Sequence, residues 1–98
     1  MADKLQFDLV SPEKLVLSAQ VDSVSVPGVE GDFGVLPNHS PVMAMVRPGV
    51  LRVENDGKFS DYHVDGGFVD VTPDGVTVLA ERILTSEEAA EEGVASDA

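Results

Sequence analysis

The chain has 98 residues, enough for one domain with a modest core, and 43% of them are hydrophobic, which excludes a chain that is disordered throughout. Its 18 acidic residues against 6 basic ones give a formal net charge of −12. Nucleic acid and anionic lipid are therefore disfavoured as partners, and a basic protein surface is favoured.

Alternation of apolar and polar residues dominates the chain as far as about Ala80 and predicts short, half-buried strands. β-Branched residues are frequent at the apolar positions, as is typical of a pleated surface. From the N-terminus, Leu5, Phe7 and Leu9 begin this pattern. Further along the chain, the positions expected to be mostly buried are Val24, Val26, Leu51, Val53, Val69, Val71, Val76 and Val78.

Turn signals separate the alternating runs. Asn55-Asp56-Gly57 predicts a hairpin loop, and Pro73-Asp74-Gly75 predicts a second turn. Gly66-Gly67 indicates a bulge or a close approach of backbones. Many short strands at this spacing favour a mostly β fold, a sandwich or a barrel.

The pattern changes near the C-terminus. Thr85 to Glu88 fits a capping box, and alanines and glutamates continue as helix formers until Gly93. We therefore expect a β domain over residues 1–84, then a short acidic helix with a frayed tail over residues 85–98. No signal peptide is expected, and the longest apolar stretch, Val42–Val46, is too short to cross a bilayer.

Signatures of catalysis are absent from the sequence. Gly31-Asp32-Phe33-Gly34 is rich in glycine but carries no lysine and leads into no helix pattern, so it does not predict a phosphate cradle. His39 and His63 are far apart, and only the fold could bring them to one metal ion. His63 alternates with two aspartates, which favours a solvated strand face over a catalytic pair. With no cysteine either, we expect no catalytic residue, cofactor or metal.

The segment 27–49 is unusual because it holds four glycines and four prolines around a few apolar residues. Such a segment predicts a long ordered loop, and long ordered loops in compact domains are often functional. Within it, the run Glu-Gly-Asp-Phe-Gly-Val-Leu-Pro-Asn-His-Ser-Pro from Glu30 to Pro41 resembles the pattern E-G-[DE]-[FL]-G-[hydrophobic]-x-P-[GN]-H-[AS]-P of the epsilon-subunit family of bacterial F-type ATP synthases. Further matches follow in the family's order at 10–13, 47–49, 66–71 and 76–81, so the resemblance covers roughly residues 5–85.

The resemblance implies a flattened sandwich of two sheets with about five strands each. It also implies a non-catalytic subunit of the central stalk, or rotor, on the cytoplasmic face of the bacterial plasma membrane. Such a subunit packs on gamma, touches the c-ring with a loop, and helps couple proton flow to ATP synthesis. Family members commonly continue as a C-terminal two-helix hairpin, which would be largely missing here.

The resemblance also implies roles for individual residues. The positions matching the c-ring loop are Glu30, Gly31, Asp32 and Phe33. The positions matching the gamma side are Ser11, His39, Ser40, Pro41, Met43, Ala44 and Met45. For the two methionines, ordinary core packing is an equally good interpretation, although methionine also suits an adaptable interface.

Two other classes of function remain open from the residues. A small β-sandwich module for carbohydrate or peptide would want exposed aromatics along a groove, but only 5% of residues are aromatic and none is Trp. A hydrolase on a β scaffold would need a convergent nucleophile and base, and the sequence offers no distinctive pair.

Overall fold

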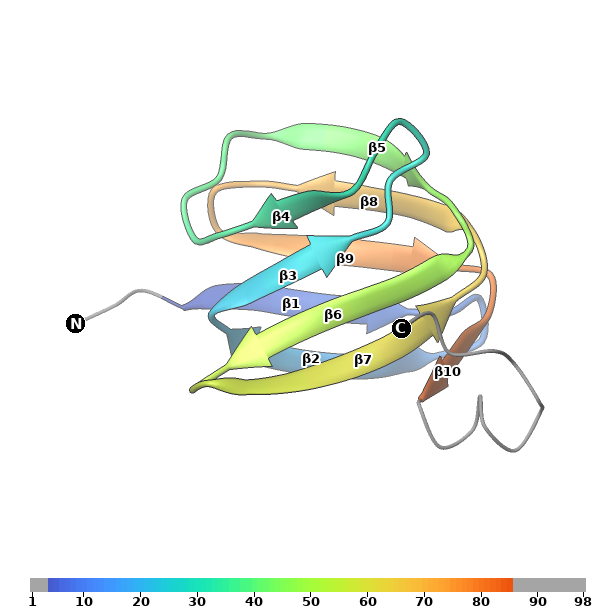
Figure 1. Ribbon diagram of the computed structural model, residues 1–98, viewed down its shortest axis with the longest axis horizontal. Coiled ribbons are helices and arrows are strands. Elements are labelled where there is room, and N and C mark those ends of the chain that lie inside the picture. The colour runs from blue at the N-terminus through green and yellow to red at the C-terminus, as the bar shows by residue number, and fades with distance from the viewer. Residues whose placement is uncertain (1–3, 86–98) are drawn as a thin grey trace.

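The alternating sequence folds into ten strands in two five-stranded sheets (Figure 1), and the computed structural model describes residues 4–85. Sheet A contains, in spatial order, β2 (Leu15–Val21), β1 (Leu5–Val10), β9 (Gly75–Ala80), β8 (Gly67–Val71) and β5 (Val42–Val46). Sheet B contains β10 (Ile83–Thr85), β7 (Lys58–Val64), β6 (Gly49–Asn55), β3 (Ser23–Val26) and β4 (Phe33–Val35). The sandwich, rather than the barrel, is confirmed.

The core lies between the two sheets and is entirely apolar among the described residues. All eight valine and leucine positions predicted to be buried are at most 4% exposed, so that prediction is confirmed. Leu5, Phe7 and Leu9 on β1 are fully buried as well. Because successive side chains of a strand point to opposite faces, the same alternation leaves the intervening residues on the outer faces of the sheets.

One predicted turn and the predicted glycine pair have the geometry that their residues favour. Asp56 and Gly57 join β6 to β7 with φ angles of 53° and 78°, as expected for a two-residue hairpin loop. At Gly67, where φ is 132°, an added Cβ would lie 1.9 Å from the carbonyl oxygen of Leu79 on β9. The predicted close approach of backbones at the glycine pair is thus confirmed.

The prediction of one long loop over residues 27–49 is wrong, because this segment contains β4 and β5. These strands have only 3 and 5 residues, too few to show a clear alternation between their glycines and prolines. The prolines and glycines instead mark the turns at the strand ends.

The parallel pairing of β1 with β9 brings the first strand beside one of the last in the middle of sheet A.

A charged cluster ties the two sheets together at one end of the sandwich. The Lys4 ammonium, just before β1, donates to Asp22 at 2.7 Å and to Asp56 in the β6–β7 turn at 3.0 Å. The Asp56 backbone amide also donates to Asp22 at 2.7 Å. The hydrogen bond from Lys4, followed by that from the Asp56 amide, lowers the pKa of Asp22, and the hydrogen bonds to Asp22 and Asp56 raise the pKa of Lys4. We refer to Lys4, Asp22 and Asp56 as the clasp.

The short helix expected after the sandwich lies outside the described residues. Thr85, expected to cap it, is the last residue of β10 and pairs with Tyr62 on β7. No helix within residues 4–85 has the length or the apolar character needed to cross a membrane.

Candidate functional site

The outer face of sheet A carries a continuous row of apolar side chains. Residues that face each other across neighbouring strands lie on the same side of a sheet. The pairing connects Met45 to Phe68, Phe68 to Leu79, Leu79 to Val10, and Val10 to Leu15, and so runs from β5 across all five strands to β2. Met45 is 61% exposed, Leu15 57% and Phe68 37%, so the row is open to solvent at both ends. We call these five residues the apolar row.

An open groove of about 800 Å³ adjoins the β5 end of this row. It is lined by the segment from Gly28 to Gly31 and by side chains that include Met43, Met45 and Phe68. His39 also lines the groove, half-buried in the connection between β4 and β5. Met43 is 68% exposed, so neither methionine packs in the core and the core interpretation is wrong.

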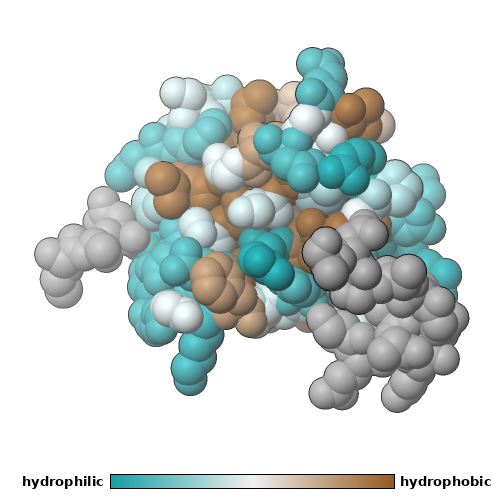
Figure 2. All heavy atoms as spheres, viewed as in Figure 1, coloured by the Kyte–Doolittle hydropathy of each residue, from teal (hydrophilic) through white to brown (hydrophobic). Residues whose placement is uncertain are grey.

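The outer face of sheet B is different in character. Arg52 forms two hydrogen bonds with Asp61, of 2.8 and 3.0 Å, and its guanidinium lies 5.5 Å from the centre of the Phe59 ring. The hydrogen bonds from Arg52 lower the pKa of Asp61. Ser25 and Glu54 flank these residues, and only a row of Val50, His63 and Leu84 near β10 has apolar ends. Figure 2, viewed from the side of β6 and β7, shows hydrophilic and hydrophobic residues interspersed on this face.

The loop between β3 and β4 bridges the two sheets. It leaves sheet B at Val26 and then pairs with the outer edge of β5, because the Val29 amide donates to the Met45 carbonyl at 2.9 Å and the Arg47 amide donates to the Pro27 carbonyl at 2.9 Å. Gly28 is required at this crossing, since an added Cβ would lie 2.5 Å from the carbonyl oxygen of Gly31. The loop that contains the residues expected to face the c-ring is therefore held by backbone hydrogen bonds to β5, the strand that carries Met43 and Met45.

The residues expected to border gamma do not all share one face. Met43 and Met45 point outward from β5, whereas Ala44 between them packs against the core. Ser40 and Pro41 are exposed in the connection that precedes β5, and His39 Nδ1 lies 2.7 Å from the carbonyl oxygen of Ser40. Ser11 lies elsewhere, directly after Val10. Its amide and its hydroxyl both donate to the Lys14 carbonyl and close the turn to β2.

Four members of the apolar row were missed by the sequence reasoning: Val10, Leu15, Phe68 and Leu79. For Phe68 a signal was present, because the alternation that buries Val69 and Val71 places their neighbour on the opposite face. Leu15 was hidden by the irregular pairing between β1 and β2, which breaks the alternation there. His39 and His63 lie in the β4–β5 connection and on sheet B, and residues 4–85 hold no group of three acidic or histidine side chains that could bind a metal ion.

Comparisons with known proteins point to one family. Residues 4–86 match the family model described as ATP synthase, Delta/Epsilon chain, beta-sandwich domain. The chain is 52% identical over 97 residues to the ATP synthase epsilon chain of Maricaulis maris, which covers 99% of this chain and 73% of that one. It is 57% identical over 82 residues to the epsilon chain of Parvibaculum lavamentivorans, covering 83% of this chain and 62% of that one.

Solved structures show the same fold. A chain in the mitochondrial ATP synthase of Euglena gracilis, a structure of OSCP, F1 and c-ring, superposes with a TM-score of 0.86 and 26% identity over 95% of this chain. This chain spans 60% of that one. A chain in the central stalk and c-ring of Tetrahymena thermophila mitochondrial ATP synthase, at 15% identity and a TM-score of 0.74, shows the fold alone. The sequence match over all of the described residues, together with the fold, places this chain in the ATP synthase delta/epsilon family, as its β-sandwich domain.

Proposed function

We propose that this chain is a non-catalytic rotor subunit of a proton-translocating F-type ATP synthase. Its role is to link the gamma subunit to the c-ring in the central stalk, at the cytoplasmic face of the bacterial inner membrane, and so to help couple proton flow to ATP synthesis. The relatives it matches are ATP synthase epsilon chains, and similar folds occur in ATP synthase complexes that include a c-ring. Family membership decides against the alternatives of a carbohydrate- or peptide-binding module and of a hydrolase.

The observation that carries the proposal is the apolar row on the outer face of sheet A. The row runs across five strands and is open to solvent at both ends. Burial of exposed apolar surface lowers the free energy, so the row favours a protein partner on this face. Met43 and Met45 lie at its β5 end, with His39 and Ser40 in the adjoining connection and Ser11 next to Val10. We assign this face to gamma, and we assign the part of the β3–β4 loop from Glu30 to Asp32, with Phe33 at the start of β4, to the c-ring.

A matched pair of substitutions tests the assignment of faces. Met45 on sheet A and Phe59 on sheet B are equally exposed, at 61% and 63%, so Met45→Asp and Phe59→Asp place a charge at comparable depth on opposite faces. A buried, unpaired carboxylate costs on the order of 2 kcal/mol or more, which corresponds to a loss of about thirtyfold in affinity. We expect Met45→Asp to weaken binding to immobilised gamma by at least that factor and Phe59→Asp to leave it unchanged.

Circular dichroism of both variants serves as the control for folding. If Met45→Asp unfolds the chain, Met43→Asp replaces it, because Met43 is 68% exposed on the same face. Equal binding by the sheet A and sheet B variants would refute the assignment. If the unmodified chain and both variants all fail to bind gamma, the proposed function itself is refuted.

A further inference from the structure

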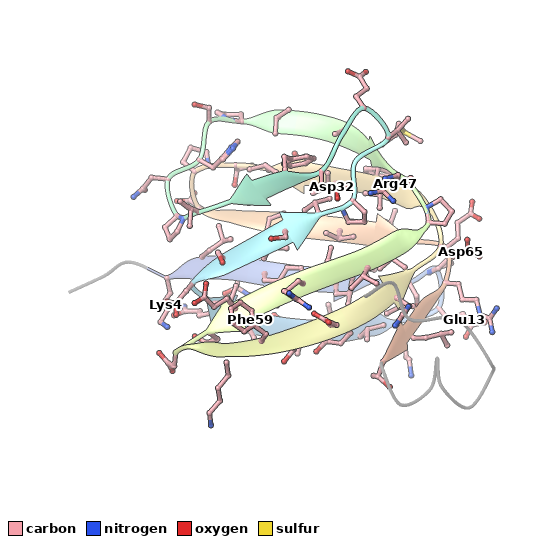
Figure 3. All side chains as sticks on the ribbon, viewed as in Figure 1. Lys4, Glu13, Asp32, Arg47, Phe59 and Asp65 are labelled. Atoms are coloured by element: carbon pink, nitrogen blue, oxygen red, sulfur yellow. The ribbon has the colours of Figure 1, made fainter. Side chains whose placement is uncertain are left out.

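The β3–β4 loop carries two acidic residues with different surroundings. Asp32 Oδ1 lies 2.5 Å from Nη2 of Arg47, the residue that follows β5, and the two side chains point toward each other (Figure 3). Glu30 is exposed and has no ion pair or hydrogen bond with any residue in the part of the chain that the structure describes. One acid of the loop is therefore neutralised internally, and the other is directed to solvent.

Arg47 holds the loop with its backbone as well as its side chain. Its amide donates to the Pro27 carbonyl, where the loop leaves sheet B, while its guanidinium reaches Asp32, where the loop returns to β4. The residue thus contacts both ends of the segment that contains Glu30. Between these two anchors, the Val29 amide is bonded to Met45 and the Gly31 amide to Gly28. Both ends of the turn are fixed, and its acidic tip lies between them.

We infer that Arg47 is a positioning residue, which engages Asp32 so that Glu30 alone is the acid the loop presents to its partner. The inference rests on the proposed function, in which this loop meets the c-ring. It changes the expectation drawn from sequence resemblance, which gave Asp32 and Glu30 the same role. The partner surface is expected to offer one basic or amide group to Glu30 rather than two cations to a pair of acids.

The exposure of the pair indicates what Arg47 does and does not contribute. Its side chain is 45% exposed and that of Asp32 is 65% exposed, and ion pairs this open to solvent add little to global stability. Their effect is local, because the pair restricts the orientation of a short loop whose other contacts are backbone hydrogen bonds. Loss of Arg47 should therefore change the loop and leave the unfolding midpoint of the sandwich nearly unchanged.

The first experiment uses the chain alone, so that it does not depend on any partner. Amide hydrogen exchange is measured at Val29 and Gly31 in the unmodified chain, in Arg47→Gln, and in the reversed pair Arg47→Asp with Asp32→Arg. We expect several-fold faster exchange in Arg47→Gln and recovery in the reversed pair, which a purely steric role of Arg47 would not produce. Arg52→Gln, which breaks the ion pair with Asp61 on sheet B, is the matched control and should leave both amides unchanged. Unchanged exchange in Arg47→Gln overturns the inference.

The second experiment measures affinity for an assembled complex of gamma and the c-ring. We expect Glu30→Gln to weaken binding several-fold, by an amount that shrinks as salt is added. Asp32→Asn and Arg47→Gln should have smaller effects, and the double variant should be no worse than the more affected single variant, because both changes break the same pair. A larger loss from Asp32→Asn than from Glu30→Gln overturns the inference, as does tighter binding by Arg47→Gln.

The two experiments separate failure of the inference from failure of the proposed function. If exchange at Val29 and Gly31 responds as expected but none of the loop variants changes affinity, the loop does not meet the ring. That result refutes the c-ring contact in the proposed function, and with it the presentation of Glu30, while Arg47 remains an anchor of the loop.

Discussion

The outer faces of sheets A and B follow the same two-residue period and carry different side chains. On sheet A, one register of cross-strand pairs is apolar from Met45 to Leu15. On sheet B, the central registers pair Ser25 with Arg52 and Arg52 with Asp61, and the exposed Phe59 is in contact with that arginine. An arginine beside an aromatic ring and a carboxylate is already partnered, whereas the exposed ends of the apolar row are not. The difference indicates that burial against a partner is more favourable for the outer face of sheet A than for that of sheet B.

The charges of the molecule bear on how a partner would reach sheet A. The loop mounted on the edge of β5 presents Glu30, and the chain as a whole has a formal charge of −12. A basic partner would be attracted over a long range and would then meet an apolar surface at the site of contact. Charge and apolar area thus act at different stages of binding, the first on encounter and the second on the stability of the complex.

The largest expected effect comes from a substitution inside sheet A, compared with a matched substitution in sheet B. Gly67→Ala places a Cβ 1.9 Å from the Leu79 carbonyl oxygen, at a φ of 132° that residues with side chains rarely adopt. We expect the free energy of unfolding to fall by about 3 kcal/mol or more, because β8 and β9 must separate or twist. Gly34→Ala on β4 is the control, since its added Cβ meets nothing within 4 Å. Urea denaturation measures both variants, and equal midpoints would show that the close approach is not required.

A smaller effect tests how far the partner extends along the apolar row. Phe68 lies next to Met45 near the groove, whereas Leu15 lies on the far edge strand. Removing a large aromatic at the centre of an interface typically costs about 2 kcal/mol or more, and a residue at the rim less than about 1 kcal/mol. We expect Phe68→Ala to weaken gamma binding more than tenfold and Leu15→Ala less than tenfold, by calorimetry. A larger loss at Leu15 would move the centre of the interface to β2.

The smallest expected effect concerns the clasp that holds the sheets together. Because the pKa of Asp22 is lowered in the folded chain, its stabilising contribution is present above the unfolded value of about 3.9 and is lost as the pH falls through the folded value. The pKa of Lys4 is raised, so its contribution is present below about 10.4 and is lost as the pH rises through the folded value.

Asp22→Asn should therefore lower the melting temperature at neutral pH and converge with the unmodified chain in strong acid. Scanning calorimetry across the acid range measures the convergence. Asp74→Asn, an exposed aspartate in the turn between β8 and β9, is the control of equal charge. If Asp74→Asn gives the same pH-dependent loss as Asp22→Asn, the effect is one of net charge and the clasp contributes nothing of its own.

The sequence predicts the inner faces of both sheets well and the outer faces poorly, for a physical reason. Burial imposes one requirement, apolarity at every second position, which a single strand displays by itself, as Val76 and Val78 do. The apolar row depends on which strands are neighbours. Val10 joins Leu79 only because β1 pairs in parallel with β9, across most of the length of the described chain. The residues within one strand do not show which strand lies beside it.

The candidate site in the β3–β4 loop was found by resemblance to a family motif and not by periodicity. Its glycines and prolines identify turns, as they should, but they concealed β4 and β5 between them. The pairing of Asp32 with Arg47 could not be foreseen either, because it depends on the loop folding back onto the edge of β5. The local sequence therefore predicts that the loop carries acidic residues. Only the fold shows that Asp32 is paired with Arg47 and that Glu30 is exposed.

The central claim, that sheet A is the covered face, is tested most directly by hydroxyl-radical footprinting of the free chain and of the chain assembled with gamma and the c-ring. Met43, Met45 and Phe59 are all more than 60% exposed in the chain alone and carry reactive side chains, so each reports on its own face. We predict that labelling of Met43 and Met45 falls several-fold on assembly while labelling of Phe59 stays the same. Protection of Phe59 with both methionines still labelled would contradict the account and assign the interface to sheet B.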